Sequence, residues 1–354
     1  MLVNDSSEIV IATRESLPES LWDDFVVGCD GAWLWHLGKS IRATSLWPGK
    51  RDLSFAVLLQ NRIIGLMPLL LVERTVGGWY TVRRLESIGG PCFCTDGGLL
   101  KTIQSRVQSE LVRLERRFQT WETHCFLSAL TPNLGLGHFP LADLGFSDTS
   151  TGTWVVDLRR DEDTIFQSYS KTTRYEIRKL INSVHIREAQ GTQDLEIYYD
   201  LHRKTYGRSG LPPHPKFYFE KIFSEFVPRH LARVLFLERN GTTIAAQNTA
   251  LFKNRAFYWT GASDDSRLGG ETKLLCHLQI LHAKKIGCEL YEMGEASPEG
   301  MGKSKTLSDF KRSLGGVLYP FYRGRRYSRN PLKRYIAMNY HARQRHSHGH
   351  GARA

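Results

Sequence analysis

Cysteine is scarce in the sequence, and the cysteines that occur are not grouped. Six residues lie scattered through apolar stretches and form no pair of C-x-x-C motifs: Cys29, Cys92, Cys94, Cys125, Cys276 and Cys288. We therefore expect buried thiols rather than a structural zinc site or a disulfide framework. This cysteine usage is typical of a protein in a reducing cytoplasm.

Long hydrophobic runs and several catalytic motifs are also absent. The longest apolar run, residues 63–72, has about half the length of a membrane span, and the first ten residues lack the pattern of a secretion signal. The sequence has no Walker loop, no G-x-S-x-G elbow and no histidines with metal-ligand spacing. These absences argue against a membrane-spanning protein, a P-loop enzyme, a serine hydrolase and a metal site.

Acidic residues are missing from the end of the chain. The chain has 48 basic and 36 acidic residues, a net charge of +12, but residues 323–354 contain nine lysines or arginines and no acid. The remaining 322 residues carry 39 basic and 36 acidic side chains, a net charge of +3. A nucleic-acid face across the whole protein is therefore not implied. With 41% hydrophobic residues in 354 positions, the chain is expected to fold into two globular domains.

The two halves of the sequence repeat one pattern of elements. Each half has a strand and a helix, a hairpin, a further strand, a glycine pair, an amphipathic helix and a final strand. The hairpin residues Asn61 and Asn240 are 179 positions apart, and the glycine pairs ending at Gly98 and Gly270 are 172 apart, both close to half of the 354 residues. This repetition predicts internal duplication and an α/β (mixed α+β) fold with a mixed, mostly antiparallel sheet flanked by helices in each half.

The repeat also predicts element and domain boundaries. In the first half the hairpin strands are expected over Leu53–Leu59 and Ile63–Val72, and one charged helix from about Glu162 to Asn182 is expected to link the halves. The polar stretch LGFSDTSTGT marks a boundary near residue 150. The predicted domains are 1–150 and 151–322, followed by a basic, His-rich tail over 323–354.

A glycine-containing turn lies between a strand and a helix in the second half. Its residues, Arg267-Leu268-Gly269-Gly270-Glu271-Thr272, resemble the pyrophosphate loop of GNAT acetyltransferases, Q/R-x-x-G-x-G/A. The resemblance implies that Arg267, Gly269 and Gly270 bind an acyl-CoA donor at a helix N-terminus. Thr272 departs from the motif and Glu271 adds a negative charge, so an ordinary helix start is the alternative reading.

Two further motifs extend this resemblance. The segment FKRSLGG, residues 310–316, resembles the F-K-x-x-[FL]-G-G signature of the Fem-type peptidoglycan-bridge aminoacyltransferases and related GNAT-superfamily N-acyltransferases, and SKTTRYEIRK, residues 170–179, resembles their interdomain helix. The resemblance spans roughly residues 8–322. It implies two tandem GNAT-like domains, with a degenerate first domain on the acceptor side and a donor and catalytic side in the second.

The resemblance implies a catalytic role for Lys311 near the reacting carbonyl, with Phe310 beside the substrate. A lysine between Phe310 and a Gly-Gly turn could offer its ammonium to a developing oxyanion; the alternative is a solvated surface lysine. Glu292 and Glu295 end the preceding strand, where three-residue spacing places them on opposite faces of a continued strand. We expect Glu295, beyond Gly294, to accept the proton of the acceptor amine, unless it pairs with Lys303 or Lys305.

Two cationic surfaces are predicted outside this centre. Lys171, Arg174 and Arg178 share one face of the linking helix, which suits the phosphates of a nucleotide-linked acceptor or an RNA donor, or is a solvated face. In the tail, Leu332, Tyr335, Ile336 and Tyr340 line one side of a basic helix over Asn330–Arg345. This helix suits an anionic membrane surface or tRNA; a disordered tail is the alternative.

Together these features predict an N-acyltransferase in which an amine attacks an activated acyl group directly, since no activated serine or cysteine is evident. The preferred donor is acyl-CoA, with an amino sugar or polysaccharide precursor of the cell envelope as acceptor. The alternatives are an aminoacyl-tRNA donor with a peptidoglycan precursor, and a non-catalytic scaffold for envelope assembly. No permanently bound cofactor is expected, the acceptor is expected to be nucleotide- or lipid-linked, and the expected location is cytoplasmic, peripheral at the inner face of the membrane.

Overall fold

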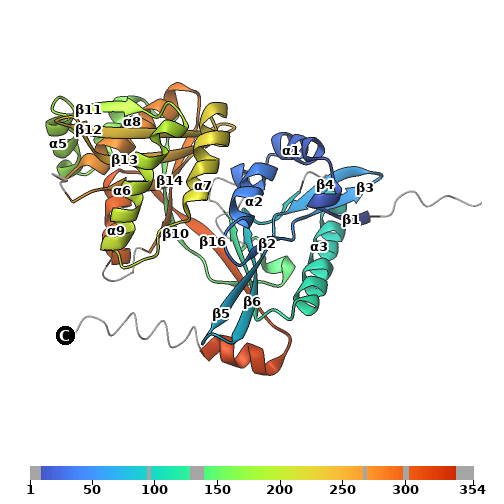
Figure 1. Cartoon of the computed structure of the whole chain (residues 1–354). Helices are drawn as coiled ribbons and strands as arrows, with labels where there is room; N and C mark the ends of the chain where they lie inside the picture. Colours follow the sequence, from blue (N-terminus) through green and yellow to red (C-terminus); the bar gives the residue numbers. More distant parts are fainter. Residues whose placement is uncertain (1–8, 94–96, 128–138, 266–268, 298–302, 340–354) are drawn as a thin grey trace, which may run out of the picture. The chain divides into compact units, whose positions relative to one another are not determined.

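The structure is a computed structural model that describes residues 9–93, 97–127, 139–265, 269–297 and 303–339. It divides into two compact units (Figure 1). Unit 1 comprises Met1–Thr151 and Pro320–Ala354, and unit 2 comprises Gly152–Tyr319. The chain thus leaves unit 1, forms all of unit 2, and returns to unit 1 through a single strand.

Unit 1 contains two sheets. The first has the strand order β1–β3–β4–β7, with strands β1 (Ile9–Thr13), β3 (Phe55–Leu59), β4 (Arg62–Met67) and β7 (Cys92–Phe93). The second has the order β16–β8–β6–β5–β2, with strands β2 (Lys50–Asp52), β5 (Leu70–Val76), β6 (Tyr80–Ile88), β8 (Glu122–Leu127) and the end of β16 (Val317–Tyr327). The short β9 (Ser147–Asp148) pairs with β16, and α1 (Glu19–Gly28) and α2 (Gly38–Ser45) precede the sheets.

Proline explains why the second hairpin strand of unit 1 is divided. The prediction of one strand over Ile63–Val72 is wrong, because β4 ends at Met67 and β5 begins at Leu70 in the other sheet. Pro68 lies between them and has no backbone N–H to continue the ladder. Because of this break, the single apolar run over residues 63–72 contributes a strand to each of the two sheets.

Helix α3 (Gly97–Arg117) provides a wall of the unit 1 core. Ile103, Val107, Leu111 and Leu114 recur at helical spacing and are all buried, in one cluster with residues of β3, β4, β6 and β8. Three- and four-residue spacing puts these side chains on one helix face, and the cluster shows that this face meets the strands.

Unit 2 is a single mixed sheet with helices on both faces. Its strand order is β11–β12–β13–β14–β15–β10, with strands β10 (Thr151–Asp157), β11 (His185–Glu188), β12 (Ala232–Arg239), β13 (Thr242–Phe252), β14 (Arg255–Ser263) and β15 (Leu290–Ala296). Its helices are α4 (Glu162–Gln167), α5 (Lys171–Leu180), α6 (Leu195–Arg208), α7 (Lys216–Lys221), α8 (Glu271–Lys285) and α9 (Lys303–Ser313).

Strand alternation sets the two faces of this sheet. Leu235 and Leu237 of β12 belong to the core cluster that contains residues of α5 and α8. Phe236 lies between them in sequence, and its ring is 6.4 Å from that of Tyr198 on α6. Because successive side chains of a strand point to opposite faces, α5 and α8 cover one face and α6 the other.

The predicted repeat is present in the structure. Two-residue turns close the hairpins β3–β4 and β12–β13, at Gln60–Asn61 and Asn240–Gly241, and all four turn residues have positive φ. In each unit a strand, a helix and a parallel strand follow, β6–α3–β8 and β14–α8–β15. The prediction of mixed, mostly antiparallel sheets flanked by helices is therefore confirmed.

Two other boundaries differ from the prediction. The linking helix is divided into α4 and α5, because the Ser170 side chain caps α5 by accepting a hydrogen bond from the Thr173 N–H. The basic tail was predicted to start at residue 323, but residues 323–327 belong to β16, where Tyr322–Tyr327 pair with β8. Their arginines therefore lie in a sheet.

The five cysteines within the described residues are buried thiols, as predicted: Cys29, Cys92, Cys125, Cys276 and Cys288. Cys94 lies outside the described residues. No helix in the described part of the chain combines the length and the apolar character needed to cross a membrane.

Candidate active site

Strands β14 and β15 are paired over only part of their length. The parallel pairs are Arg255 with Leu290, Ala256 with Tyr291 and Phe257 with Glu292. Beyond them β14 continues beside β13, and β15 continues beside β10. The two strands therefore diverge after Phe257 and Glu292, at the carboxyl edge where open α/β sheets commonly carry their chemistry.

The diverging end of β15 contains a bulge at Gly294. Thr153 of β10 lies opposite Glu295 and Val155 opposite Glu292, so two residues of β15 oppose one of β10. Gly294 has a φ of 73°, which side chains rarely adopt, and its carbonyl accepts a 2.9 Å hydrogen bond from Thr153 Oγ1. The extra residue interrupts strand alternation, so the expectation that Glu292 and Glu295 lie on opposite faces does not apply to this strand.

Lys311 of α9 lies against this bulge. Its side chain is buried, and its Nζ donates a 2.6 Å hydrogen bond to the backbone carbonyl of Glu295. A Cβ atom built on Gly294 would be only 3.6 Å from the same Nζ. Lys311 is therefore not the solvated surface lysine of the alternative reading.

Burial dominates the electrostatics of Lys311. Loss of solvent lowers the pKa of its ammonium from 10.5 to about 8, while the carboxylates of Glu292 and Glu295 act in the opposite direction. Glu292 is fully buried and Glu295 is half-buried. A desolvated ammonium can stabilise a developing oxyanion, and its lowered pKa also allows it to release a proton.

Of the two lysines predicted as alternative partners of Glu295, the structure describes the side chain of Lys305 only. Lys305 forms an ion pair of 2.6 Å with Asp309 on its own helix. The side chain of Lys303 lies outside the described residues. Glu295 itself acts electrostatically on Lys311, so its carboxylate belongs to the Lys311 centre.

Aromatic and sulfur-containing side chains complete the surroundings of Lys311. Phe310 packs against the unit 2 core, and its ring lies 6.3 Å from that of Tyr258 on β14. Cys276 of α8 is fully buried, and burial raises the pKa of its thiol although the charge of Lys311 opposes this. The thiol stays protonated, so the centre favours direct attack on the acyl group over a thiolate nucleophile.

The motif FKRSLGG holds α9 in this position. The backbone N–H of Ser170 donates a 2.9 Å hydrogen bond to the carbonyl of Ser313, which ties the end of α9 to the start of α5. A side chain at Gly316 would place its Cβ 2.7 Å from the carbonyl oxygen of Val155. The final glycine therefore allows the chain to pass close to β10.

The predicted pyrophosphate loop lies at the start of α8. Gly270 precedes the helix, Gly269 is exposed, and Arg267 lies outside the described residues. Glu271, in the first turn, is buried, and Glu176 of α5 packs against Gly270 while forming a 2.6 Å ion pair with Lys273. Two carboxylates therefore lie at the N-terminus of α8. The unpaired N–H groups of a helix N-terminus would otherwise favour an anion such as a pyrophosphate.

Two residues of the predicted cationic stripe on the linking helix, Arg174 and Arg178, make contacts inside unit 2. Arg174 donates hydrogen bonds to the backbone carbonyls of Gln167 and Tyr169, which fixes the turn between α4 and α5. The guanidinium of Arg178 lies 5.2 Å from the centroid of the Phe166 ring, and Lys171 is exposed. Within the part of the chain that the structure describes, the contacts of Arg174 and Arg178 lie at the turn between α4 and α5 and not at Lys311.

Sequence reasoning missed several residues of the Lys311 centre, namely Tyr258, Cys276 and Gly294 as the origin of the bulge. Gly294 has a recognisable signal, because a glycine inside a β-rich run indicates a bulge. Tyr258 and Cys276 carry no such signal, since the packing of β14 and α8 alone brings Tyr258 against Phe310 and Cys276 near Lys311. Within the described residues, no three His, Cys, Asp or Glu side chains are grouped to hold a metal ion.

Comparison with known proteins identifies the fold. Residues 167–312 match the family model described as an acetyltransferase (GNAT) domain. The structure of FemX is similar with a TM-score of 0.69 and 14% identity, covering 90% of this chain and 98% of FemX. No curated protein matches the chain by sequence.

Two further solved structures resemble the chain. L-PGS from Bacillus licheniformis has a TM-score of 0.55 and 16% identity, with coverage of 91% of this chain and 96% of that one. A tandem GNAT protein from the clavulanic acid biosynthesis pathway has a TM-score of 0.55 and 12% identity, with coverage of 91% and 99%. The predicted tandem GNAT-like fold is therefore confirmed, and the chain contains an acetyltransferase (GNAT) domain over residues 167–312.

Proposed function

We propose that the chain is an N-acyltransferase that forms an amide on an amine of a cell-envelope precursor. The observation that carries this proposal is the buried Lys311, whose Nζ is held 2.6 Å from the Glu295 carbonyl at the point where β14 and β15 diverge. The resemblance to Fem-type enzymes supports an envelope precursor as acceptor.

In the proposed reaction the acceptor nitrogen attacks the carbonyl carbon of the activated acyl group. The tetrahedral oxyanion is stabilised by the ammonium of Lys311. Its collapse breaks the bond to the leaving group, which is the CoA thiolate for an acyl-CoA donor or the ribose oxygen for an aminoacyl-tRNA. The proton lost by the amine passes to the Glu295 carboxylate and on to solvent or the leaving group.

Acyl-CoA is the first candidate donor, because a GNAT domain generally uses this co-substrate. The second is aminoacyl-tRNA, with a peptidoglycan precursor as acceptor. Glu176 and the buried Glu271 at the start of α8 favour this second candidate, since they oppose a pyrophosphate there.

The experiment is a product assay over both donor classes. The chain is incubated with acetyl-CoA or charged tRNA and a panel of UDP-linked amino sugars and peptidoglycan precursors, and amide products are detected by mass spectrometry. A product that requires Lys311 but not Lys305, the exposed lysine of the same helix, supports the proposal. Turnover that survives Lys311→Met unchanged would overturn it.

A further inference from the structure

The hairpin of β5 and β6 in unit 1 ends in exposed hydrophobic side chains. Trp79 in its turn is 84% exposed, and Val76 and Tyr80, which pair across the hairpin, are 50% and 40% exposed. Tryptophan usually loses most of its surface to a core. A tryptophan displayed at the end of a hairpin is therefore a candidate contact residue for something outside the chain.

A short helix over residues 331–339 presents a second hydrophobic surface. Leu332, Tyr335 and Ile336 share one face and are 67%, 68% and 43% exposed. An adjacent face attaches the helix to unit 1, because Ala337 is buried and Lys333 Nζ donates a 2.7 Å hydrogen bond to the Gln119 carbonyl. The helix thus lies on unit 1 with its apolar face outward.

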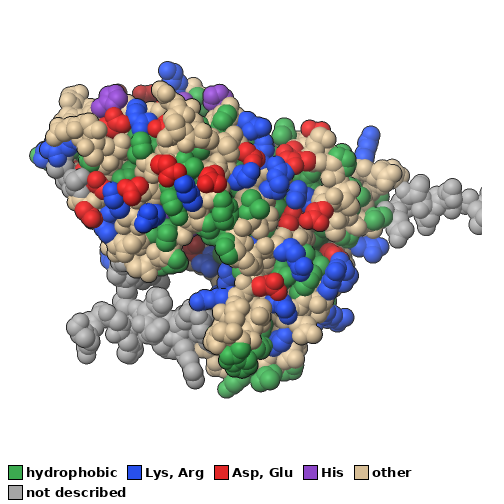
Figure 2. Space-filling model, viewed as in Figure 1, with side chains coloured by type: hydrophobic (Ala, Val, Ile, Leu, Met, Phe, Trp, Pro, Cys, Tyr) green, Lys and Arg blue, Asp and Glu red, His purple; other side chains and the backbone are tan. Residues whose placement is uncertain are grey.

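Trp121 connects the hairpin to the start of this helix. Its ring lies 5.9 Å from that of Tyr80, its backbone N–H donates to the carbonyl of Arg83, and its backbone carbonyl accepts a 2.8 Å hydrogen bond from the Ser328 N–H. Figure 1 shows the end of the hairpin beside the red C-terminal helix, and Figure 2 shows hydrophobic side chains gathered there. The two exposed surfaces therefore form one face, which we call the hairpin–helix face.

The charge around the hairpin–helix face is strongly basic. Residues 73–83, 112–119 and 328–339 contain eight arginines or lysines and two acids, Glu73 and Glu115. Each acid is bound by an arginine, Glu73 by Arg83 at 2.7 Å and Glu115 by Arg326 at 3.2 Å. The face therefore combines apolar side chains with an excess of positive charge.

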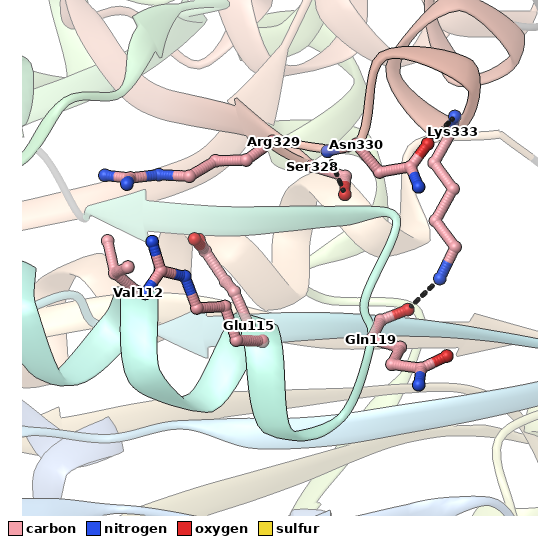
Figure 3. A pocket seen from close by; sticks show the side chains of 8 residues that line it. Val112, Glu115, Gln119, Ser328, Arg329, Asn330 and Lys333 are labelled. Atoms are coloured by element: carbon pink, nitrogen blue, oxygen red, sulfur yellow. Dashed lines mark hydrogen bonds between the residues drawn. The ribbon is translucent and has the colours of Figure 1, made fainter.

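A groove beside this face gathers part of the positive charge (Figure 3). It has a volume of about 370 Å³ and lies between the end of α3 and residues 328–333. Its charged lining consists of Arg116, Arg329, Lys333 and the Glu115 carboxylate that Arg326 already binds. A phosphate group would meet a net positive surface there.

We propose that the hairpin–helix face docks unit 1 on a bilayer that contains anionic lipids. Trp79, Leu332 and Ile336 enter the boundary between headgroups and acyl chains, and Arg116, Arg329 and Arg334 contact lipid phosphates. RNA is the less suitable occupant, because exposed aliphatic side chains such as Leu332 and Ile336 add little to base stacking or phosphate contacts.

The test is flotation of the whole chain with lipid vesicles. Neutral phosphatidylcholine vesicles are compared with vesicles of phosphatidylcholine and phosphatidylglycerol, at 0.1 M and at 0.5 M salt. The variants are Trp79→Ser and the triple change Leu332→Ser, Tyr335→Ser and Ile336→Ser. The matched control is the double change Val27→Ser and Leu46→Ser, which removes side chains of unit 1 that are 62% and 54% exposed elsewhere.

We expect the chain to bind anionic vesicles and this binding to weaken in high salt. Binding should fall roughly tenfold or more in either test variant and stay unchanged in the control. Thermal unfolding of the variants should match that of the wild type, because the changed side chains are exposed. Vesicle binding that neither test variant reduces would overturn the proposal. The proposal would also be overturned if the wild-type protein does not float with the vesicles and the same variants impair tRNA binding or self-association.

Discussion

The ammonium of Lys311 is hydrogen-bonded to the backbone carbonyl of Glu295 at 2.6 Å, and Lys311 is only 5% exposed. This contact joins α9 to the bulge in β15. The carbonyl replaces part of the hydration that the ammonium loses on burial. The bulge therefore stabilises a cation that is largely shielded from solvent at the carboxyl edge of the sheet.

Removal of the Lys311 charge is expected to reduce turnover. Lys311→Met should lower kcat about 10²- to 10³-fold, the range for loss of one oxyanion-stabilising group. KM for the donor should change much less, because the ammonium acts mainly in the transition state. The control is Lys305→Met, whose exposed ion pair with Asp309 contributes little. Equal kinetics for the two variants would contradict a catalytic role for Lys311.

The rate should depend on pH through Lys311. Its pKa is about 8, so the protonated form that stabilises an oxyanion is lost as pH rises through this value. We expect kcat to fall above about pH 8 in the wild type, and the fall to move to higher pH in Lys311→Arg, since arginine stays charged. A rate that keeps rising to pH 9 in the wild type would instead indicate that neutral Lys311 acts as a base.

The same pKa predicts a stability difference. The pKa of Lys311 is about 8 in the folded chain and 10.5 as its ordinary value, so between these pH values the unfolded chain binds the extra proton. The free energy of unfolding of the wild type should therefore rise between pH 8 and 10.5 relative to Lys311→Met, with the cost of burying the ammonium fully present below pH 8. Urea titrations of both proteins at pH 7 and 10 measure this; a difference that shrinks or stays constant would show that the ammonium is not penalised by burial.

Gly294 should affect activity beyond its effect on stability. Gly294→Ala is expected to cost about 1–2 kcal/mol of unfolding free energy, because its φ is 73°, and to reduce kcat by displacing the bulge from Lys311. Gly241→Ala is the matched control, with a φ of 74° and no atom within 4 Å of its Cβ. Both variants should lose similar stability in thermal unfolding, but only Gly294→Ala should lose activity. Equal activity in both would remove the functional role of the bulge.

Glu176 provides a test of the donor. Glu176→Gln removes a carboxylate from the start of α8 and leaves Lys273 without its 2.6 Å ion pair, so CoA should bind roughly two- to fivefold more tightly, measured by calorimetry. Glu162→Gln, an exposed first-turn acid of α4, should leave the affinity unchanged. An unaltered CoA affinity in Glu176→Gln would mean that no donor pyrophosphate lies at this helix end.

The sequence allowed the repeated unit and the sheet class to be predicted, because turn residues and strand runs are local signals. The FKRSLGG motif singled out Lys311, whose catalytic role stays a prediction. The arrangement around Lys311 was less accessible. Glu292 and Glu295, which both act on Lys311, lie on either side of the extra residue that Gly294 brings to β15, and Cys276 comes from a helix that precedes this strand. The linking helix is divided because Ser170 caps α5, and the hairpin strand is divided because Pro68 interrupts it. Both residues are visible in the sequence, but the helical or apolar pattern around each of them continues and hides the break.

Strand β16 also bears on the order in which the chain can fold. Residues Tyr322–Tyr327 pair with β8, and the next strands of the same sheet, β6 and then β5, are made more than two hundred residues earlier. A growing chain therefore leaves the ribosome with unit 1 lacking a strand, while unit 2 is already complete in sequence. During synthesis the edge of β8 stays unpaired until β16 is made, so unit 2 can fold first although the synthesis of unit 1 begins first.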